Sequence, residues 1–266
     1  MTRRWSLVGL IVALAAALSF VVFGMGFDAD SSAKAAPDKK AQTAKGPSVK
    51  QVDSSKLQGL AWWPAHEKSG PAVADAVADH HAQVRGTVAR TKGPNGGALK
   101  LDGASGHAIV ETPLIDTSKS DYSVAARVRI ENKGFRAAVS MDGDQHSIFF
   151  LQYEDIDRRF AFAFANARAV GIKMGEPVAG RWYHLLGTYD QQSGTLSIYV
   201  NGKLMGTAQA RNPERATGPL VIGRGKYEGK EVDFWSGAIA DVHLFGRTLT
   251  AAEAAALAAK EPAPSK

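Results

Sequence analysis

Alternation of apolar and polar residues predicts that the folded part of the chain is built from β-strands. From Tyr122 to Ile130 every second residue is apolar or aromatic, whereas Arg127 and Arg129 stand at intervening positions. Alternate residues of a strand point to opposite faces of a sheet, so this run is typical of a half-buried strand. Residues 160–165 alternate phenylalanine with alanine. They predict a second strand, with an aromatic face in the core and an alanine face that leaves room for something close-packed.

Turn and cap signals extend this pattern. Short apolar runs are separated by Gly, Asn, Asp and Pro at the spacing typical of a β-sandwich. Asn201-Gly202 lies between two such runs and predicts a tight hairpin, because these residues supply the positive φ angles of a type I′ turn. Thr250 and Glu253 have the spacing of a capping box ahead of an alanine-rich stretch. We therefore expect an all-β fold with one short C-terminal helix.

An uncharged stretch near the N-terminus predicts export. Trp5 to Phe27 carries no charge and, as a helix, could cross a hydrocarbon core of roughly 30 Å. Basic residues precede it and acidic residues follow it, which places the remainder outside the cytoplasmic membrane. Residues 1–30 are either a retained membrane anchor or a signal peptide cleaved at the small-residue sequence Ala33-Lys34-Ala35. In both cases we expect membrane contact through this segment alone.

Composition divides the rest of the chain into three parts. Residues 31–56 are rich in Ala, Lys, Ser, Asp, Gln and Pro and cannot bury enough apolar surface to offset their chain entropy. They are expected to be a disordered spacer. Residues 57–259 have the apolar content of one folded domain, and residues 260–266 are expected to be a disordered tail.

Charge and cysteine content exclude several functions. The 32 Lys and Arg residues exceed the 26 Asp and Glu residues, which gives a net charge of +6, and the basic residues are spread along the chain rather than gathered into a stripe. A nucleic-acid partner is not expected, because such proteins gather their basic residues into a patch or stripe. The positive balance still favours anionic glycans or wall polymers through long-range attraction. The absence of cysteine excludes disulfides, thiolate zinc sites and cysteine catalysis.

Several short motifs follow one another along residues 57–259. They are Ala61-Trp62-Trp63-Pro64, Ala98 to Gly103, Trp182-Tyr183-His184, Gly187-Thr188-Tyr189-Asp190, Tyr199 to Lys203, Ile222-Gly223-Arg224 and Phe234 to Phe245. In this order they resemble the LamG-like jelly-roll domains of the concanavalin A-like lectin and glucanase superfamily. The resemblance implies a two-sheet antiparallel jelly-roll sandwich with one concave sheet. Fold alone does not assign a function, because the superfamily includes lectins, hydrolases and adhesion modules.

The resemblance also implies a calcium ion at the rim of the sandwich. Asp75, Asp102 and Asp241 stand at the matching motif positions. Calcium takes six to eight oxygen ligands, so these carboxylates would have to converge in space together with backbone carbonyls. The alternative is local: Asp102-Gly103 is also typical of an ordinary turn, and Asp241 could cap backbone amides.

Two arginines on the strand from Tyr122 to Ile130 are candidate ligand contacts. Arg127 and Arg129 lie on the face opposite the core residues, and Arg136 follows nearby. Forked hydrogen bonds from arginine suit the carboxylate, sulfate or phosphate groups of an anionic polymer. The alternative is that their stems cover sheet surface. Arg127 also stands where the family often has a tryptophan, which argues against a sugar-stacking platform at this position.

Two aromatic residues are a second candidate site. Tyr227 and Trp235 flank the polar stretch 228–233 and could offer ring faces beside hydrogen-bonding groups. The alternative places Trp235 in the core, since only one of the adjacent residues Phe234 and Trp235 can face inward.

The residues needed for glycan hydrolysis are incomplete. Glu231-Val232-Asp233 begins the motif Glu-x-Asp-x-(x)-Glu of the superfamily's retaining glucanases, but Phe234-Trp235-Ser236 follows, so the proton-donating glutamate is missing. We therefore expect no enzyme activity. The favoured interpretation is an extracytoplasmic module that binds carbohydrate or cell-wall polymer. A protein-interaction or adhesion domain that binds a surface protein is the alternative, and a glycan hydrolase is a third hypothesis.

Overall fold

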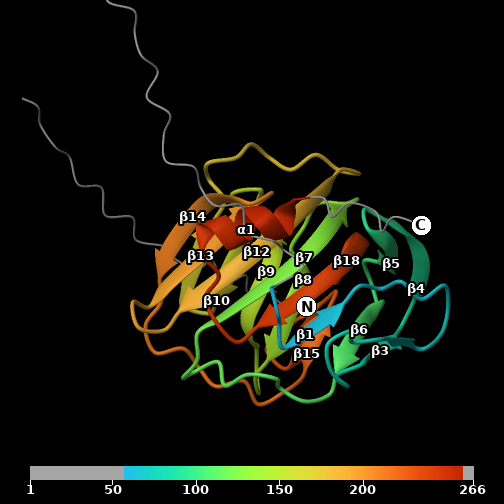
Figure 1. Ribbon diagram of the computed structural model, residues 1–266, viewed down its shortest axis with the longest axis horizontal. Helices are drawn as coiled ribbons and strands as arrows, with labels where there is room; N and C mark the ends of the chain where they lie inside the picture. Colours follow the sequence, from blue (N-terminus) through green and yellow to red (C-terminus); the bar gives the residue numbers. More distant parts are fainter. Residues whose placement is uncertain (1–56, 260–266) are drawn as a thin grey trace, which may run out of the picture. The chain divides into compact units, whose positions relative to one another are not determined.

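The computed structural model describes residues 57–259, which form two antiparallel sheets packed face to face (Figure 1). The predictions for residues 1–30, 31–56 and 260–266 fall outside this range. No helix within it is long and apolar enough to span a membrane. The expected all-β sandwich with a short C-terminal helix is confirmed.

One sheet, here called sheet A, has the strand order β14-β13-β12-β7-β18-β5-β4, with β1 paired to β18 beside this path. Its strands are β1 (Ala61–Trp63), β4 (Val88–Gly93), β5 (Gly96–Asp102), β7 (Tyr122–Ile130), β12 (Trp182–Asp190), β13 (Thr195–Val200), β14 (Lys203–Gln209) and β18 (Ser236–Phe245). The first part of β18 pairs with β5 and the last part with β1. Asp241 lies between these parts, where the pairing of β18 with β7 is irregular, and its φ is 48°.

The second sheet, sheet B, has the order β11-β10-β9-β8-β15-β6-β3-β2. Its strands are β2 (Ala72–Val73), β3 (Ala82–Arg85), β6 (His107–Val110), β8 (Arg136–Asp142), β9 (Ser147–Glu154), β10 (Arg159–Phe164), β11 (Ala167–Val170) and β15 (Leu220–Ile222). A separate hairpin joins β16 (Gly225–Tyr227) to β17 (Lys230–Val232). Glu228 and Gly229 turn this hairpin with φ values of 49° and 71°, as a type I′ turn requires.

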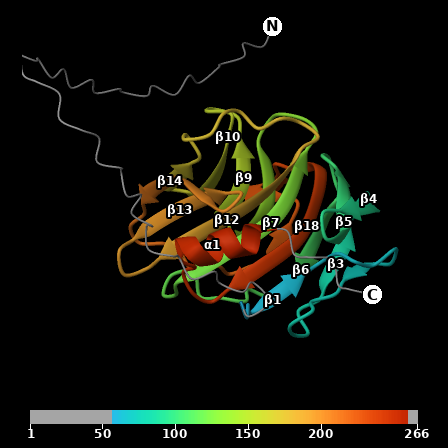
Figure 2. The same cartoon turned by 45° about the horizontal axis from the view of Figure 1, so that its top comes forward.

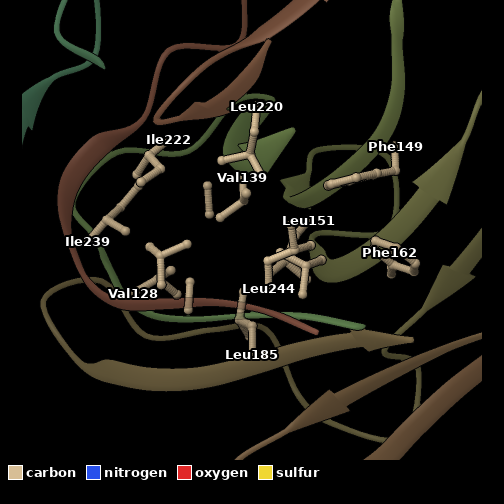
Figure 3. Close-up of a cluster of buried hydrophobic side chains, with 14 of the residues drawn as sticks. Val128, Val139, Phe149, Leu151, Phe162, Leu185, Leu220, Ile222, Ile239 and Leu244 are labelled. Atoms are coloured by element: carbon tan, nitrogen blue, oxygen red, sulfur yellow. The ribbon is translucent and has the colours of Figure 1, made fainter. Parts of the chain in front are cut away.

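The core lies between the two sheets and follows the alternation of the sequence. Figure 3 shows apolar side chains of both sheets meeting there: Val128, Leu185, Ile239 and Leu244 from sheet A, and Val139, Phe149, Leu151, Phe162, Leu220 and Ile222 from sheet B. Phe160 and Phe162 are fully buried, and Phe164 is 6% exposed. The predicted aromatic face of β10 is therefore confirmed.

The predicted hairpin turn at Asn201-Gly202 and the predicted capped C-terminal helix are also confirmed. Asn201 and Gly202 have φ values of 49° and 76° between β13 and β14. Helix α1 (Ala251–Ala258) begins at the N-cap Thr250, whose side chain accepts a hydrogen bond from the Glu253 amide while the Glu253 carboxylate accepts one from the Thr250 amide. Figure 2 shows α1 lying over the outer face of sheet A. Leu257 and its neighbours pack there against apolar residues of β7, β12 and β18.

The close approach of the sheets at Gly187 provides a stability test. A Cβ atom at Gly187 on β12 would collide with the Phe162 ring. We expect Gly187→Ala to lower the free energy of unfolding by about 1–3 kcal/mol, because the core has no room for an added methyl group. Urea unfolding followed by tryptophan fluorescence measures this change. Gly175→Ala is the matched control, since nothing lies within 4 Å of its added Cβ; an equal loss in both variants would contradict the explanation.

Candidate functional site

The outer face of sheet B has a depression where the small alanine side chains of β10 lie between larger side chains of the neighbouring strands. On β10, Ala161 and Ala163 point outward because the phenylalanines point into the core. Strand pairing places Ala163 between Phe150 on β9 and Arg168 on β11. This row forms the floor of a hollow of about 780 Å³, here called the groove. The size is within the range of about 300–1,000 Å³ found for small-molecule sites.

The β16–β17 hairpin and the loop before β8 form the wall of the groove. Tyr227, Glu228, Val232 and Asp233 from the hairpin region and Phe135 from the loop line it. Tyr227 is 59% exposed and Phe135 is 37% exposed, so both rings are accessible to a ligand.

Hydrogen bonds and close packing hold the hairpin against sheet B. The Lys226 amide donates to Ser147 Oγ over 2.9 Å, and the Lys226 ammonium donates to the Gly143 carbonyl over 3.0 Å. Gly225 lies so near Phe150 that a Cβ there would be 2.6 Å from the ring. At the base, the buried pair Arg224–Asp142 has a 2.6 Å contact. These contacts give Tyr227 a rigid support, which reduces the entropy lost when a ligand binds.

The groove combines opposite charges. Arg168 Nη1 lies 3.7 Å from a carboxylate oxygen of Glu154, whose side chain is fully buried. The same carboxylate accepts hydrogen bonds from the amides of Ile156 and Asp157. On the opposite wall, burial raises the pKa of Asp233, and the nearby Arg136 opposes this effect. Arg168 is therefore countered by carboxylates, and the lining has no excess of positive charge.

Tyr227 is the one predicted contact that lines this groove, and Trp235 is not accessible. Trp235 is 0% exposed, and its Nε1 donates to the Arg129 carbonyl over 3.3 Å. It belongs to the core, as the alternative for this residue stated, because adjacent strand residues face opposite sides. Glu231 lies 3.4 Å from Arg224 Nε and does not line the groove, whereas Asp233 does.

Sequence reasoning missed Phe135, Phe150, Gln152 and Arg168 as lining residues. They come from three segments, the loop before β8, β9 and β11, which only strand pairing brings together. The available signal was the alanine face of residues 160–165, which does form the low floor.

Arg127 lies under α1 and holds the end of the helix. Its Nη2 donates to the carbonyls of Leu257, Ala258 and Ala259 at 3.3, 3.5 and 3.3 Å. These carbonyls have no partner within the helix, and a cation stabilises the negative end of the helix dipole. Arg127 Nε also lies 3.4 Å from the Asp241 carboxylate. The guanidinium of Arg127 is therefore occupied by contacts within the domain.

Neutral histidines surround this ion pair. Burial, with a further contribution from Arg127, lowers the pKa of His184 well below its ordinary value and that of His243 to about 3. Both rings are therefore uncharged beside Arg127 at neutral pH, and Asp241 supplies the opposing charge. Burial raises the pKa of Asp241, while Arg127 and Asn95 act to lower it.

Arg129 and Arg136 are also engaged within the domain. Arg129 lies 3.4 Å from Glu131 and stacks over Trp182 at 5.4 Å from the ring centroid. Arg136 donates to the carbonyls of Phe234 and Lys133 over 2.9 and 3.2 Å. The three arginines do not form a common anion-binding face.

The predicted calcium ligands lie in three separate networks. Asp75 accepts hydrogen bonds from the amides of Trp62 and Val77. Asp102 accepts from the amides of Ala104, Ser105 and Gly106, which hold its pKa well below the ordinary value although burial acts to raise it. Asp241 is paired with Arg127. Residues 57–259 contain no group of three or more His, Asp or Glu side chains that could hold a metal ion, so these aspartates do not fit a shared calcium site.

Removal of Arg127 tests its role beneath α1. We expect Arg127→Ala to lower the free energy of unfolding by about 3–5 kcal/mol, because Asp241 then stays buried without its partner. Arg129→Ala is the control, with an expected loss of about 1 kcal/mol or less, since this pair is more exposed. Urea unfolding measures both. Equal losses would contradict a structural role specific to Arg127.

Calcium dependence can be checked directly. Because the three aspartates do not converge, we expect the melting temperature to be the same with added calcium and with a chelator. Thermal unfolding in both conditions measures this, with magnesium as the control cation. A rise of the melting temperature that is specific to calcium would show a calcium site in the protein.

Comparison with known proteins places this architecture in a family. The family described as the Concanavalin A-like lectin/glucanases superfamily matches residues 102–255. A search of curated proteins found no match.

Solved structures share the fold at low sequence identity. Domain 4 of an extracellular arabinanase from Geobacillus stearothermophilus, in complex with arabinotriose, has a TM-score of 0.59 and 18% identity, covering 75% of this chain and 98% of that one. Trypanosoma rangeli sialidase in complex with sialic acid has a TM-score of 0.57 and 20% identity, covering 74% of this chain but 32% of the sialidase. The binding domain of a paraclostridial mosquitocidal protein has a TM-score of 0.56 and 14% identity, covering 75% and 51%. Since the family match spans more than half of the sequence, the chain belongs to the concanavalin A-like lectin/glucanase superfamily.

Proposed function

We propose that the protein is a carbohydrate-binding module that acts outside the cytoplasmic membrane without catalysis, and that the groove on sheet B is its binding site. The observation that carries this proposal is the accessible Tyr227 ring on the wall of a hollow of about 780 Å³. The uncharged N-terminal stretch, which lies outside the described residues, supports the location.

The side chains of the groove suit a sugar. A sugar ring presents apolar C–H faces and a rim of hydroxyl groups, so it binds where aromatic surface lies beside donors and acceptors. Tyr227, Phe135 and Phe150 supply the aromatic surface. Gln152 and Arg168 on the floor can donate hydrogen bonds, and Gln152 can also accept them.

The charge balance favours an uncharged glycan over an anionic wall polymer at this site. Arg168, the one Lys or Arg among the described residues that line the groove, faces the buried carboxylate of Glu154. Glu228 and Asp233 add negative charge on the wall. An anionic polymer would therefore meet net repulsion here. The arabinanase domain and the sialidase supply suitable probes, arabinotriose as a neutral sugar and sialic acid as an anionic one.

Binding and the role of Tyr227 can be tested together. A glycan array identifies the bound polymer, and titration calorimetry with its oligosaccharides, beginning with arabinotriose, measures affinity. We expect neutral glycans to bind and sialic acid not to bind. Tyr227→Ala should weaken binding about tenfold, because the loss of a stacking contact costs about 1–1.5 kcal/mol.

Val178→Ala is the matched control. Val178 is 59% exposed, as Tyr227 is, but does not line the groove, so its substitution should leave affinity unchanged. If the unmodified protein binds no glycan, the proposal fails and recognition of a protein becomes the better hypothesis.

A further inference from the structure

A second hollow lies where β11 of sheet B meets β14 of sheet A. It has a volume of about 280 Å³ and is lined by Val170, Ile172, Lys173, Met205 and Thr207 together with Arg168. Arg168 also lines the groove. The two hollows therefore adjoin at this side chain.

Strand register explains why the hollows lie side by side. One row across sheet B runs from Phe150 through Ala163 to Arg168, with all three side chains on the outer face. In the adjacent row, Ala161 pairs with Val170, which lines the second hollow. The small alanines keep the surface low, so no tall side chain of β10 separates the two spaces.

The surface beside β11 is also depressed, because the backbones of β11 and β14 approach closely there. A Cβ atom at Gly206 on β14 would collide with the Val170 carbonyl. The Lys173 amide donates to the Met205 carbonyl over 3.3 Å, which ties the segment after β11 to β14. These backbone contacts between β14 and the segment around residues 170–173 therefore fix the shape of the second hollow.

Like the groove, the second hollow combines apolar surface with hydrogen-bonding groups, although its apolar residues are aliphatic and its charged residues are basic. Ile172 is 71% exposed, and together with Val170 and Met205 it offers apolar surface to a sugar ring. Lys173 and Thr207 supply hydrogen-bonding groups beside it. Between the two spaces, Arg168 is held by Glu154, and its remaining N–H groups are available to a ligand that passes from one hollow to the other.

We propose that the groove and the second hollow form one binding track for consecutive units of a single glycan chain, with Arg168 at the junction. This inference rests on the proposed function, and it adds that the ligand is an oligomeric chain longer than the groove alone holds. Binding should therefore strengthen with chain length until the second hollow is filled.

Substitution of Ile172 separates the two hollows. Affinities are measured by titration calorimetry with the full protein and a series from disaccharide to hexasaccharide of the glycan bound on the array, arabinan oligosaccharides being tried first. In the unmodified protein we expect the hexasaccharide to bind about tenfold more tightly than the trisaccharide. Ile172→Arg, which fills the second hollow, should bring the hexasaccharide to the affinity of the trisaccharide and change the trisaccharide by less than about twofold.

Val178→Arg is the matched control, because Val178 is 59% exposed but lines neither hollow. It should alter no affinity, and melting temperatures verify that both variants fold. Equal binding of short and long chains by the unmodified protein, or an unchanged hexasaccharide affinity in Ile172→Arg, would overturn the second subsite. In either event a loss of binding in Tyr227→Ala would still support the groove, whereas no binding of any chain would contradict both proposals.

Discussion

The structure depends on the packing of the aromatic face of β10 between the sheets. Phe162 lies against the bare backbone at Gly187, and Phe164 contacts Tyr122 and Tyr189 with ring centroids 6.4 and 5.0 Å apart. The same alternation turns Ala161 and Ala163 outward. One strand thus provides both a bulky core face and a low outer floor, so the position of the groove follows from the packing of the core.

The arginines are used mainly to hold the domain together. Arg127 binds the carbonyl end of α1, which has no basic residue in its own last turn, and Asp241 balances its charge. Arg136 holds loop carbonyls, and Arg224 forms a buried pair with Asp142 below the hairpin. Together with the carboxylates of the groove wall, these internal partners leave the groove without an excess of positive charge.

The proposed site is assembled from segments that are distant in the sequence. A strand row supplies Phe150 and Arg168, and the β16–β17 hairpin adds Tyr227 above it. The hairpin lies over sheet B because Gly225 permits close approach to Phe150. Shape and mixed polarity at this position suit a sugar chain, and the continuation past Arg168 suits several consecutive units.

The sequence by itself determined the strands, the Asn201-Gly202 hairpin and the capped helix, because alternation, turn chemistry and capping are local properties. It also carried the ordered motifs by which the superfamily was identified. Only the tertiary structure decided which polar residues are accessible. Arg127 is buried because α1 covers it, and Trp235 is buried because it packs into the core. Asp75, Asp102 and Asp241 lie apart because strand pairing places them in different parts of the domain. Burial and proximity depend on contacts between distant segments, and no local pattern encodes them.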